Sequence, residues 1–190
     1  MYWRSNLSYV ELRLGNPERA LEELNKAWEI AVEGEYFSDQ RNILREMGLL
    51  YLEMNFLSKA QQTAARLREL CQQAPNKKLI RDYYYLLGMI ELKKKNYPQA
   101  VELIQKTSDL LTATSALHLN WGYSMGLAFY RAGDLENAAK EYEKLPSLKT
   151  GRLSGYGDLY VKSFYRLGRI YDCLLYTSDA ADELDGVDLG

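Results

Sequence analysis

The fold of this chain is decided by residues 84–100, which read YYLLGMIELKKKNYPQA. This stretch predicts a helix, a tight turn at Asn96 and the start of a second helix. The same arrangement recurs along the chain. A glycine of the first helix recurs at Gly48, Gly88, Gly126 and Gly168, and an alanine of the second at Ala20, Ala60, Ala100 and Ala138. So regular a period, close to 40 residues, is typical of a helical repeat array.

The repeats are predicted near residues 1–34, 37–74, 77–112, 115–146 and 156–172, the last with only its first helix. Apolar residues follow the helical period within each segment, and Gly34, Pro75 and Pro146 mark ends of helices. Ser38 and Asp158 are candidate N-caps. The prediction is an all-α solenoid of about four and a half helical hairpins.

The recurring glycines predict a close contact between helices. Glycine inside a helix is destabilising by about 1 kcal/mol relative to alanine, so four recurrences need a packing reason. The simplest is that the two helices of each hairpin touch there, with the recurring alanine as the small partner on the facing helix. For the fifth repeat, whose second helix is missing, we expect an uncovered apolar face.

The small residue in the first helix, the Gly-Asp/Asn turn and the alanine of the second helix resemble tetratricopeptide (TPR) repeats. The best match is Gly126, then Gly133-Asp134-Leu135, Ala138 and Tyr142. The period departs from the 34 residues of that family. The resemblance implies a right-handed α-α superhelix that acts as a non-enzymatic protein-protein interaction scaffold. Long-helix arrays of this kind resemble those attached to bacterial regulators, so a fragment of a larger bacterial regulatory protein is expected.

The composition is that of an ordinary soluble protein. The 190 residues are 47% hydrophobic and 26% charged, with a net charge of −2. This charge does not indicate nucleic acid as a partner. No apolar run approaches the roughly 20 residues of a membrane-spanning helix, and the N-terminus lacks the pattern of a signal peptide. Two cysteines make no disulfide framework, and a cytoplasmic location is expected.

Residues 173–190 differ in character from the rest. Their sequence, CLLYTSDAADELDGVDLG, resembles the in-frame translation of a transposase sequencing adapter. The prediction is a non-native, adapter-derived tail that follows Asp172. A genuine acidic tail is the alternative. The tail holds five acidic residues and no Lys or Arg, so the preceding part has 24 basic against 21 acidic residues.

Catalytic chemistry is not indicated. His118 is the only histidine, which excludes two-histidine metal sites, and it is best interpreted as a helix-start or packing residue. Cys71 lies on an apolar helix face and is expected to be a buried small hydrophobe. The glycines between Gly151 and Asp158 match neither the dinucleotide nor the P-loop pattern. No catalytic residue, metal or cofactor is therefore expected.

The informative surface is the inner face of the first helices, which lines the concave groove in TPR arrays. Aromatic and arginine side chains are enriched in binding hot spots. The candidate partner-binding residues are Asn42, Arg45, Tyr85, Asn120, Tyr123, Tyr130, Arg131, Lys162, Tyr165, Arg166 and Arg169. The groove is basic toward its C-terminal end, so an acidic or extended peptide is the expected ligand class. An alternative use of these tyrosines is packing between repeats. The alternative function is a structural spacer or a module that self-associates through the truncated last repeat.

Overall fold

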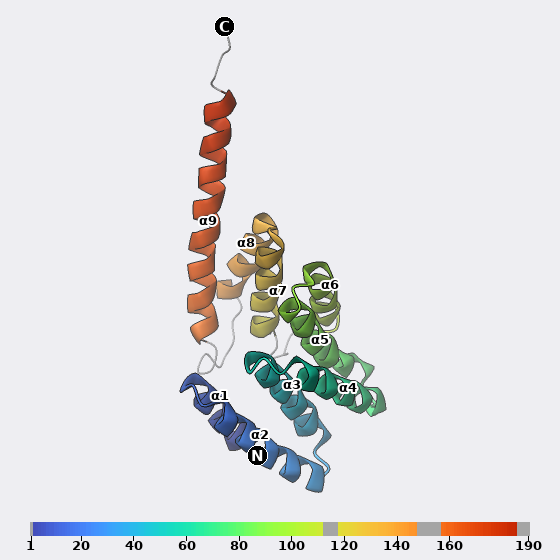
Figure 1. Cartoon of the computed structure of the whole chain (residues 1–190). Helices are drawn as coiled ribbons and strands as arrows, with labels where there is room; N and C mark the ends of the chain where they lie inside the picture. Colours follow the sequence, from blue (N-terminus) through green and yellow to red (C-terminus); the bar gives the residue numbers. More distant parts are fainter. Residues whose placement is uncertain (1, 112–117, 148–156, 186–190) are drawn as a thin grey trace. The chain divides into compact units, whose positions relative to one another are not determined.

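The computed structural model describes residues 2–111, 118–147 and 157–185, with side chains described for 4–111, 119–146 and 158–175. These residues form α-helices joined by short turns, with two 3-10 helices (Figure 1). The α-helices are α1 (Tyr2–Arg13), α2 (Pro17–Glu33), α3 (Phe37–Glu53), α4 (Leu57–Gln73), α5 (Arg81–Lys93), α6 (Tyr97–Ser108), α7 (His118–Ala132), α8 (Leu135–Lys144) and α9 (Gly157–Asp185). The 3-10 helices are η1 (Lys77–Ile80) and η2 (Leu145–Ser147). The predicted all-α repeat fold is confirmed.

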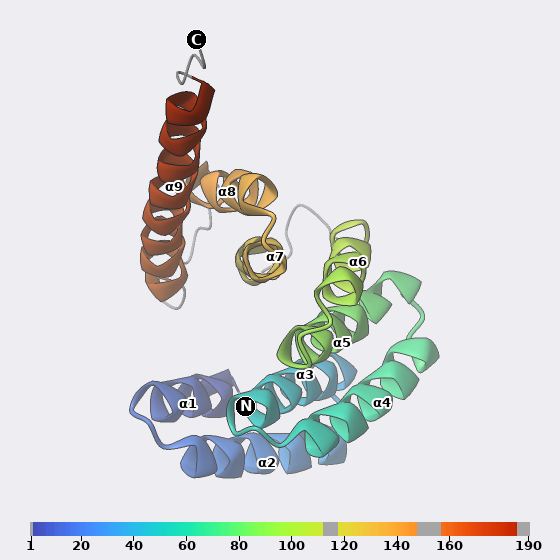
Figure 2. The ribbon, with the colours of Figure 1, turned by 45° about the horizontal axis from the view of Figure 1, so that its top comes forward.

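The chain divides into two compact units, Met1–Leu111 and Thr112–Gly190. The first unit contains three consecutive hairpins, α1–α2, α3–α4 and α5–α6 (Figures 1 and 2). Helix α3 packs against its hairpin partner α4, and it also contacts α2 of the previous hairpin and α5 of the next. The second unit pairs α7 with α8, and α9 packs against both. Stacking of this kind buries an apolar face that one hairpin could not bury alone.

The turns inside the hairpins share one backbone geometry. Gly15, Asn55, Lys95 and Gly133 all have positive φ, between 61° and 85°. In each turn the amide of the next residue donates to a carbonyl five positions earlier, as Asn96 N does to Glu91 O at 2.9 Å. This is the Schellman ending, which satisfies the last free carbonyls of a helix. The next helix begins two residues after the left-handed residue, so the chain reverses within a very short turn.

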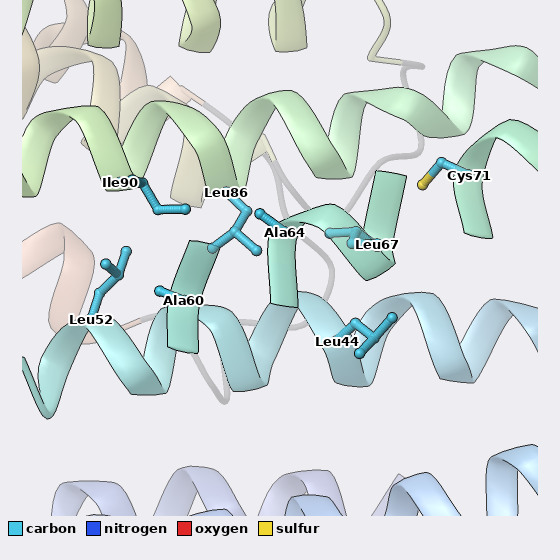
Figure 3. Close-up of a cluster of buried hydrophobic side chains, with 8 residues drawn as sticks. All are labelled: Leu44, Leu52, Ala60, Ala64, Leu67, Cys71, Leu86 and Ile90. Carbon is cyan, nitrogen blue, oxygen red and sulfur yellow. The ribbon is translucent and has the colours of Figure 1, made fainter. Parts of the chain in front are cut away.

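The hydrophobic core runs through the hairpin interfaces. Figure 3 shows one cluster, in which side chains of α3, α4 and α5 meet. Its buried members are Leu44, Leu52, Ala60, Ala64, Leu67, Cys71, Leu86 and Ile90. The recurring alanines at 20, 60, 100 and 138 are all 0% exposed, as expected for the point of closest approach between helices.

The recurring glycines behave in three different ways. At Gly88 the expectation is confirmed, because an added Cβ would lie 2.7 Å from Ile104 Cγ1 and 3.4 Å from Ala100 O, both on the hairpin partner α6. At Gly126 the hairpin partner is also the neighbour, through the Tyr142 ring at 2.7 Å. Gly48 departs from the prediction. An added Cβ on Gly48 would meet Leu86 of the next hairpin, so this glycine makes room between repeats. A Cβ added on Gly168 would meet no described atom of another element within 4 Å.

Several predicted boundaries need correction. Helix α3 begins at Phe37 with Tyr36 at the N-cap, so Ser38 lies inside the helix. Helix α9 begins at Gly157, so Asp158 lies in its first turn and accepts a hydrogen bond from Lys162 at 3.1 Å. Helix α9 also continues without interruption from residue 172 to Asp185. The glycine-rich loop before Asp158 falls mostly outside the described residues. The non-native origin of the tail stays a prediction.

Candidate functional site

In the first unit, the predicted site residues of α3 lie beside a buried carboxylate. Arg45 Nη1 is 3.3 Å from Asp82 Oδ1 and also donates to Asn42 Oδ1 at 3.2 Å. Arg41, one turn earlier, places its Nε 2.5 Å from Asp82 Oδ2. The Asp82 carboxylate is 1% exposed and each arginine side chain is 15% exposed. These three residues therefore form an ion cluster that joins α3 to α5.

The structure gives a different role to two of the predicted partner-binding residues, Arg45 and Tyr85. Arg45 already pairs with Asp82 of the next hairpin, and Tyr85 is only 4% exposed. Arg45 thus joins neighbouring repeats, and the burial of Tyr85 fits the packing role that the sequence left open. The sequence analysis missed Arg41. Its position four residues before Arg45, on the same face of the helix, is the signal that could have found it.

A second carboxylate, Glu46, lies next to the cluster on α3. Burial raises its pKa above the usual value, while Arg45 and a hydrogen bond from Ser5 of α1 act in the opposite direction. Desolvation disfavours the charged form of a carboxyl group. A buried carboxyl group therefore binds its proton more tightly in the folded protein than in the unfolded chain. Glu46 therefore couples the stability of the first unit to pH.

In the second unit, three predicted residues come together. Arg166 of α9 lies with its guanidinium carbon 5.0 Å from the centre of the Tyr130 ring of α7. It also shares a side-chain hydrogen bond with Tyr123, which lies two turns before Tyr130 on the same face of α7. The ring of Tyr123 lies 5.7 Å from that of Tyr142 in α8. We refer to Tyr123, Tyr130, Tyr142 and Arg166 as the Tyr/Arg cluster.

The Tyr/Arg cluster differs from the ion cluster of the first unit in two respects. Among the described residues, no carboxylate pairs with Arg166, whereas Arg41 and Arg45 share Asp82 and Lys162 has Asp158. The hydroxyl of Tyr142 is fully buried and has no hydrogen-bond partner in the described part of the chain. Burial raises the pKa of this phenol, so it is a neutral donor. Arg166 is thus a half-buried cation without a described carboxylate partner, whereas the Tyr142 hydroxyl is enclosed in the core.

The other predicted residues of the second unit lie around this cluster. Lys162, Tyr165 and Arg169 are exposed on α9, and Arg169 Nη1 lies 3.5 Å from the Tyr165 hydroxyl. Arg131 is exposed at the end of α7, and Asn120 is half-buried near its start. The sequence identified Tyr142 only as part of the repeat match. It could not reveal that the hydroxyl would be without a partner, because that depends on which side chains surround it.

The described residues give little support to catalysis. The Cys71 thiol is 2% exposed and lies 3.3 Å from Leu79 O, and burial raises its pKa to about 11. It is therefore a protonated core residue and a poor nucleophile at neutral pH. His118 begins α7. In the parts of the chain with described side chains, no group of three His, Cys, Asp or Glu residues could hold a metal ion.

One cavity of the first unit was not foreseen. It has a volume of about 420 Å³, lies between α4, η1 and α5, and includes no acidic residue in its lining. Two of the lining residues are basic, but Lys77 already donates to Gln72 O at 2.9 Å, and the cavity opens widely to solvent. Its lining residues are Arg68, Cys71, Gln72, Lys77, Ile80, Tyr83, Tyr84 and Leu87.

Comparison with known proteins supports the fold. The TPR-like repeats of a kinesin light chain-like protein from Podosopora anserina superpose with a TM-score of 0.59 at 14% identity, over 97% of this chain and 91% of that one. A structure of MamA superposes with a TM-score of 0.45 at 16% identity, over 89% of this chain and 95% of that one. MamA from Desulfovibrio magneticus RS-1 gives 0.43 at 21% identity, over 90% and 93%.

These comparisons show the fold, a TPR-like solenoid, and identify no partner or specific function. At 14% identity the first similarity concerns the fold alone, and the TM-scores of the MamA structures are too low to add to it. No protein-family model and no curated protein matches the chain. Within the described residues, no helix combines the length and the apolar character needed to cross a membrane.

Proposed function

We propose that this TPR-like solenoid is a non-enzymatic scaffold that binds an acidic peptide, or an acidic segment of a partner domain, at the Tyr/Arg cluster. The observation that carries the proposal is Arg166, stacked on Tyr130 and bonded to Tyr123 without a described carboxylate partner. A stacked arginine is held in place before the ligand arrives, which lowers the entropic cost of binding.

The chemistry of the cluster favours a carboxylate ligand. Arginine binds carboxylates through two parallel hydrogen bonds, and these charge-assisted bonds are stronger than neutral ones. Arg131 and Arg169 add positive charge nearby, both at exposed positions. Aromatic side chains beside the arginine provide apolar area for the rest of the peptide.

The wider setting follows from the resemblance of the repeats. We propose that the array is part of a larger bacterial regulatory protein, in the cytoplasm, with the peptide lying in the concave groove. The second candidate function is a spacer or self-association module without a peptide ligand. Exposed apolar residues on α9, among them Phe164 and Val161, favour it.

The experiment is peptide selection against the full chain. Random dodecapeptides displayed on phage are selected on the wild-type protein, and the affinity of the enriched peptides is measured by fluorescence anisotropy. We expect Asp or Glu in every enriched family and a loss of affinity at high salt. Arg166→Ala should weaken binding tenfold or more, and Arg166→Lys should restore only part of it because lysine lacks the planar fork.

The matched control is Lys140→Ala, which removes one positive charge from an exposed position of α8. This variant should bind the selected peptides within about twofold of wild type, as is usual for exposed charges outside a hot spot. Equal binding by wild type and Arg166→Ala would contradict the proposed site. Selection of peptides without acidic residues would contradict the proposed ligand class.

A further inference from the structure

The connection between α4 and α5 is longer than the one between α2 and α3, and a cavity lies beside it. Three residues, 34–36, join α2 to α3, whereas seven residues, 74–80, join α4 to α5 and include the 3-10 helix η1. The cavity between α4, η1 and α5 has a volume of about 420 Å³. This volume lies within the range of about 300–1,000 Å³ that is usual for small-molecule sites.

Hydrogen bonds hold the wall of the cavity that η1 forms. The Cys71 thiol at the end of α4 donates to Leu79 O of η1 at 3.3 Å. Lys77 Nζ, also in η1, donates to Gln72 O at 2.9 Å. Both bonds tie η1 to the last turn of α4, so this wall is in place before a ligand arrives. A site that is already formed binds its ligand at a lower entropic cost.

The lining of the cavity divides into an apolar part and a polar part. Its buried and half-buried members are apolar or aromatic, and they are Cys71, Ile80, Tyr83, Tyr84 and Leu87. Its exposed members are polar, and they are Arg68, Gln72 and Lys77. The polar groups therefore lie at the mouth. The two tyrosine rings, with centres 5.6 Å apart, offer the flat surface against which an aromatic ligand packs.

The positive charge at the mouth is not neutralised by the lining, which includes no acidic residue. The guanidinium carbon of Arg68 lies 5.8 Å from the centre of the Tyr83 ring, and no carboxylate of the described residues pairs with it. Lys77 gives one of its three ammonium donors to Gln72 O. The C-terminal end of α4 contributes about half a negative charge, which is less than the two positive charges. An excess of positive charge therefore remains.

We infer that this cavity binds a small organic anion in which a carboxylate is attached to a flat aromatic ring. The ring packs in the apolar part, beside Tyr83 and Tyr84, and the carboxylate accepts hydrogen bonds from Arg68 and Lys77 at the mouth. An anion without a ring would leave the apolar walls in water, and a ring without a charge would leave the two cations unpaired. The ligand is a free small molecule, and its site belongs to the first unit, whereas the Tyr/Arg cluster belongs to the second.

The test uses the full chain with 2-naphthoate as the probe, and isothermal titration calorimetry measures its affinity. We expect saturable binding to one site that weakens as salt is added. The neutral 2-naphthamide has the same ring without the charge, so it should bind about tenfold more weakly. Acetate has the charge without the ring, so it should not displace 2-naphthoate at equal concentration.

Variants of exposed residues separate the two halves of the site. Arg68→Gln removes the charge, so it should weaken 2-naphthoate by about tenfold and leave the affinity for 2-naphthamide unchanged. Gln72→Trp places an indole in the cavity and should weaken both compounds. The matched control is Lys78→Gln, which removes one positive charge from an exposed position of η1 outside the lining. It should bind 2-naphthoate within about twofold of wild type. Circular dichroism verifies that each variant keeps its helical content.

Three results would overturn the inference. The first is the absence of saturable 2-naphthoate binding up to about 1 mM. The second is equal affinity of wild type and Arg68→Gln for 2-naphthoate, or of wild type for 2-naphthoate and 2-naphthamide. The third is loss of 2-naphthoate binding in Arg166→Ala, because the compound would then occupy the Tyr/Arg cluster.

The same variants keep this inference separate from the proposed function. Arg166→Ala should bind 2-naphthoate like wild type, and Arg68→Gln should bind the selected acidic peptides like wild type. Failure of one proposal would therefore leave the other standing.

Discussion

Gly88 and Ile104 lie so close together that a Cβ atom on the glycine would be 2.7 Å from Ile104 Cγ1. This contact holds α5 against α6 near Ala100, which is fully buried. A Cβ on the equivalent Gly168 of α9 would meet no described atom of another element within 4 Å. The same repeat position is thus tightly packed at Gly88 and has no such contact at Gly168. Substitutions at the two positions should therefore change stability in opposite directions.

Gly88→Leu should destabilise the first unit by about 1–3 kcal/mol because the larger side chain overpacks the contact with α6. Gly168→Ala should instead stabilise the second unit by about 1 kcal/mol, the helix preference of alanine over glycine. Urea denaturation of both variants and the wild type measures the difference. An unchanged midpoint for Gly88→Leu would remove the packing explanation of the recurring glycine.

Asp82→Asn should destabilise the chain by about 3 kcal/mol. Removing one partner of a buried ion pair leaves uncompensated charge, at a typical cost of about 3–5 kcal/mol, and the partial exposure of Arg41 and Arg45 favours the lower end. Thermal and urea unfolding measure the loss. Asp109→Asn, at an exposed position of the same unit, is the control and should change stability by less than about 0.5 kcal/mol.

Glu46→Gln should raise the stability of the first unit at pH 7. The folded pKa of Glu46 is raised above its usual 4.5, so the folded state binds the proton more tightly than the unfolded state. The stability that the folded state gains from this tighter proton binding is fully present below about pH 4.5 and is lost as the pH rises through the folded pKa. The advantage of the variant should therefore shrink as the pH falls from 7 toward 4.5. Melting temperatures across that range, with Glu53→Gln as the exposed control on α3, test the trend; a constant difference would contradict it.

Lys95→Gly should stabilise the turn between α5 and α6 by about 0.5–1 kcal/mol. Lys95 has a φ of 64°, a left-handed conformation that costs a residue with a Cβ about 1–2 kcal/mol, and part of the gain is offset by the greater freedom of glycine when unfolded. Lys93→Gly, inside α5, should have the opposite sign. Differential scanning calorimetry of the two variants measures both effects. If both variants are destabilised, the backbone at residue 95 is not strained.

Tyr142→Phe should stabilise the second unit by about 1 kcal/mol, because it removes a buried hydroxyl that has no hydrogen-bond partner among the described residues. Tyr123→Phe should destabilise by a similar amount because it removes the hydrogen bond to Arg166. Equilibrium unfolding in urea measures both. Loss of stability in Tyr142→Phe would show that the hydroxyl is already satisfied.

Part of the candidate site was visible in the sequence. Tyr123, Tyr130 and Arg166 fall on the predicted inner face by their register with the glycines, and the structure brings them together. Arg45 and Tyr85 have the same register, but Arg45 pairs with Asp82 of a neighbouring repeat and Tyr85 is buried. The sequence could not separate the two groups, because register fixes the face of a helix and does not fix how deeply a side chain is covered by the next hairpin.

The sequence by itself determined the period, the helical hairpins and the alanines of the closest contacts, because these follow from helical spacing and from the size of side chains. Only the tertiary structure decided that Gly48 admits Leu86 of the next hairpin, that Asp82 pairs with two arginines and that Arg166 has Tyr130 beneath it. Such outcomes depend on distances between segments far apart in the sequence, 37 residues in the case of Arg45 and Asp82, and local periodicity contains no information about them.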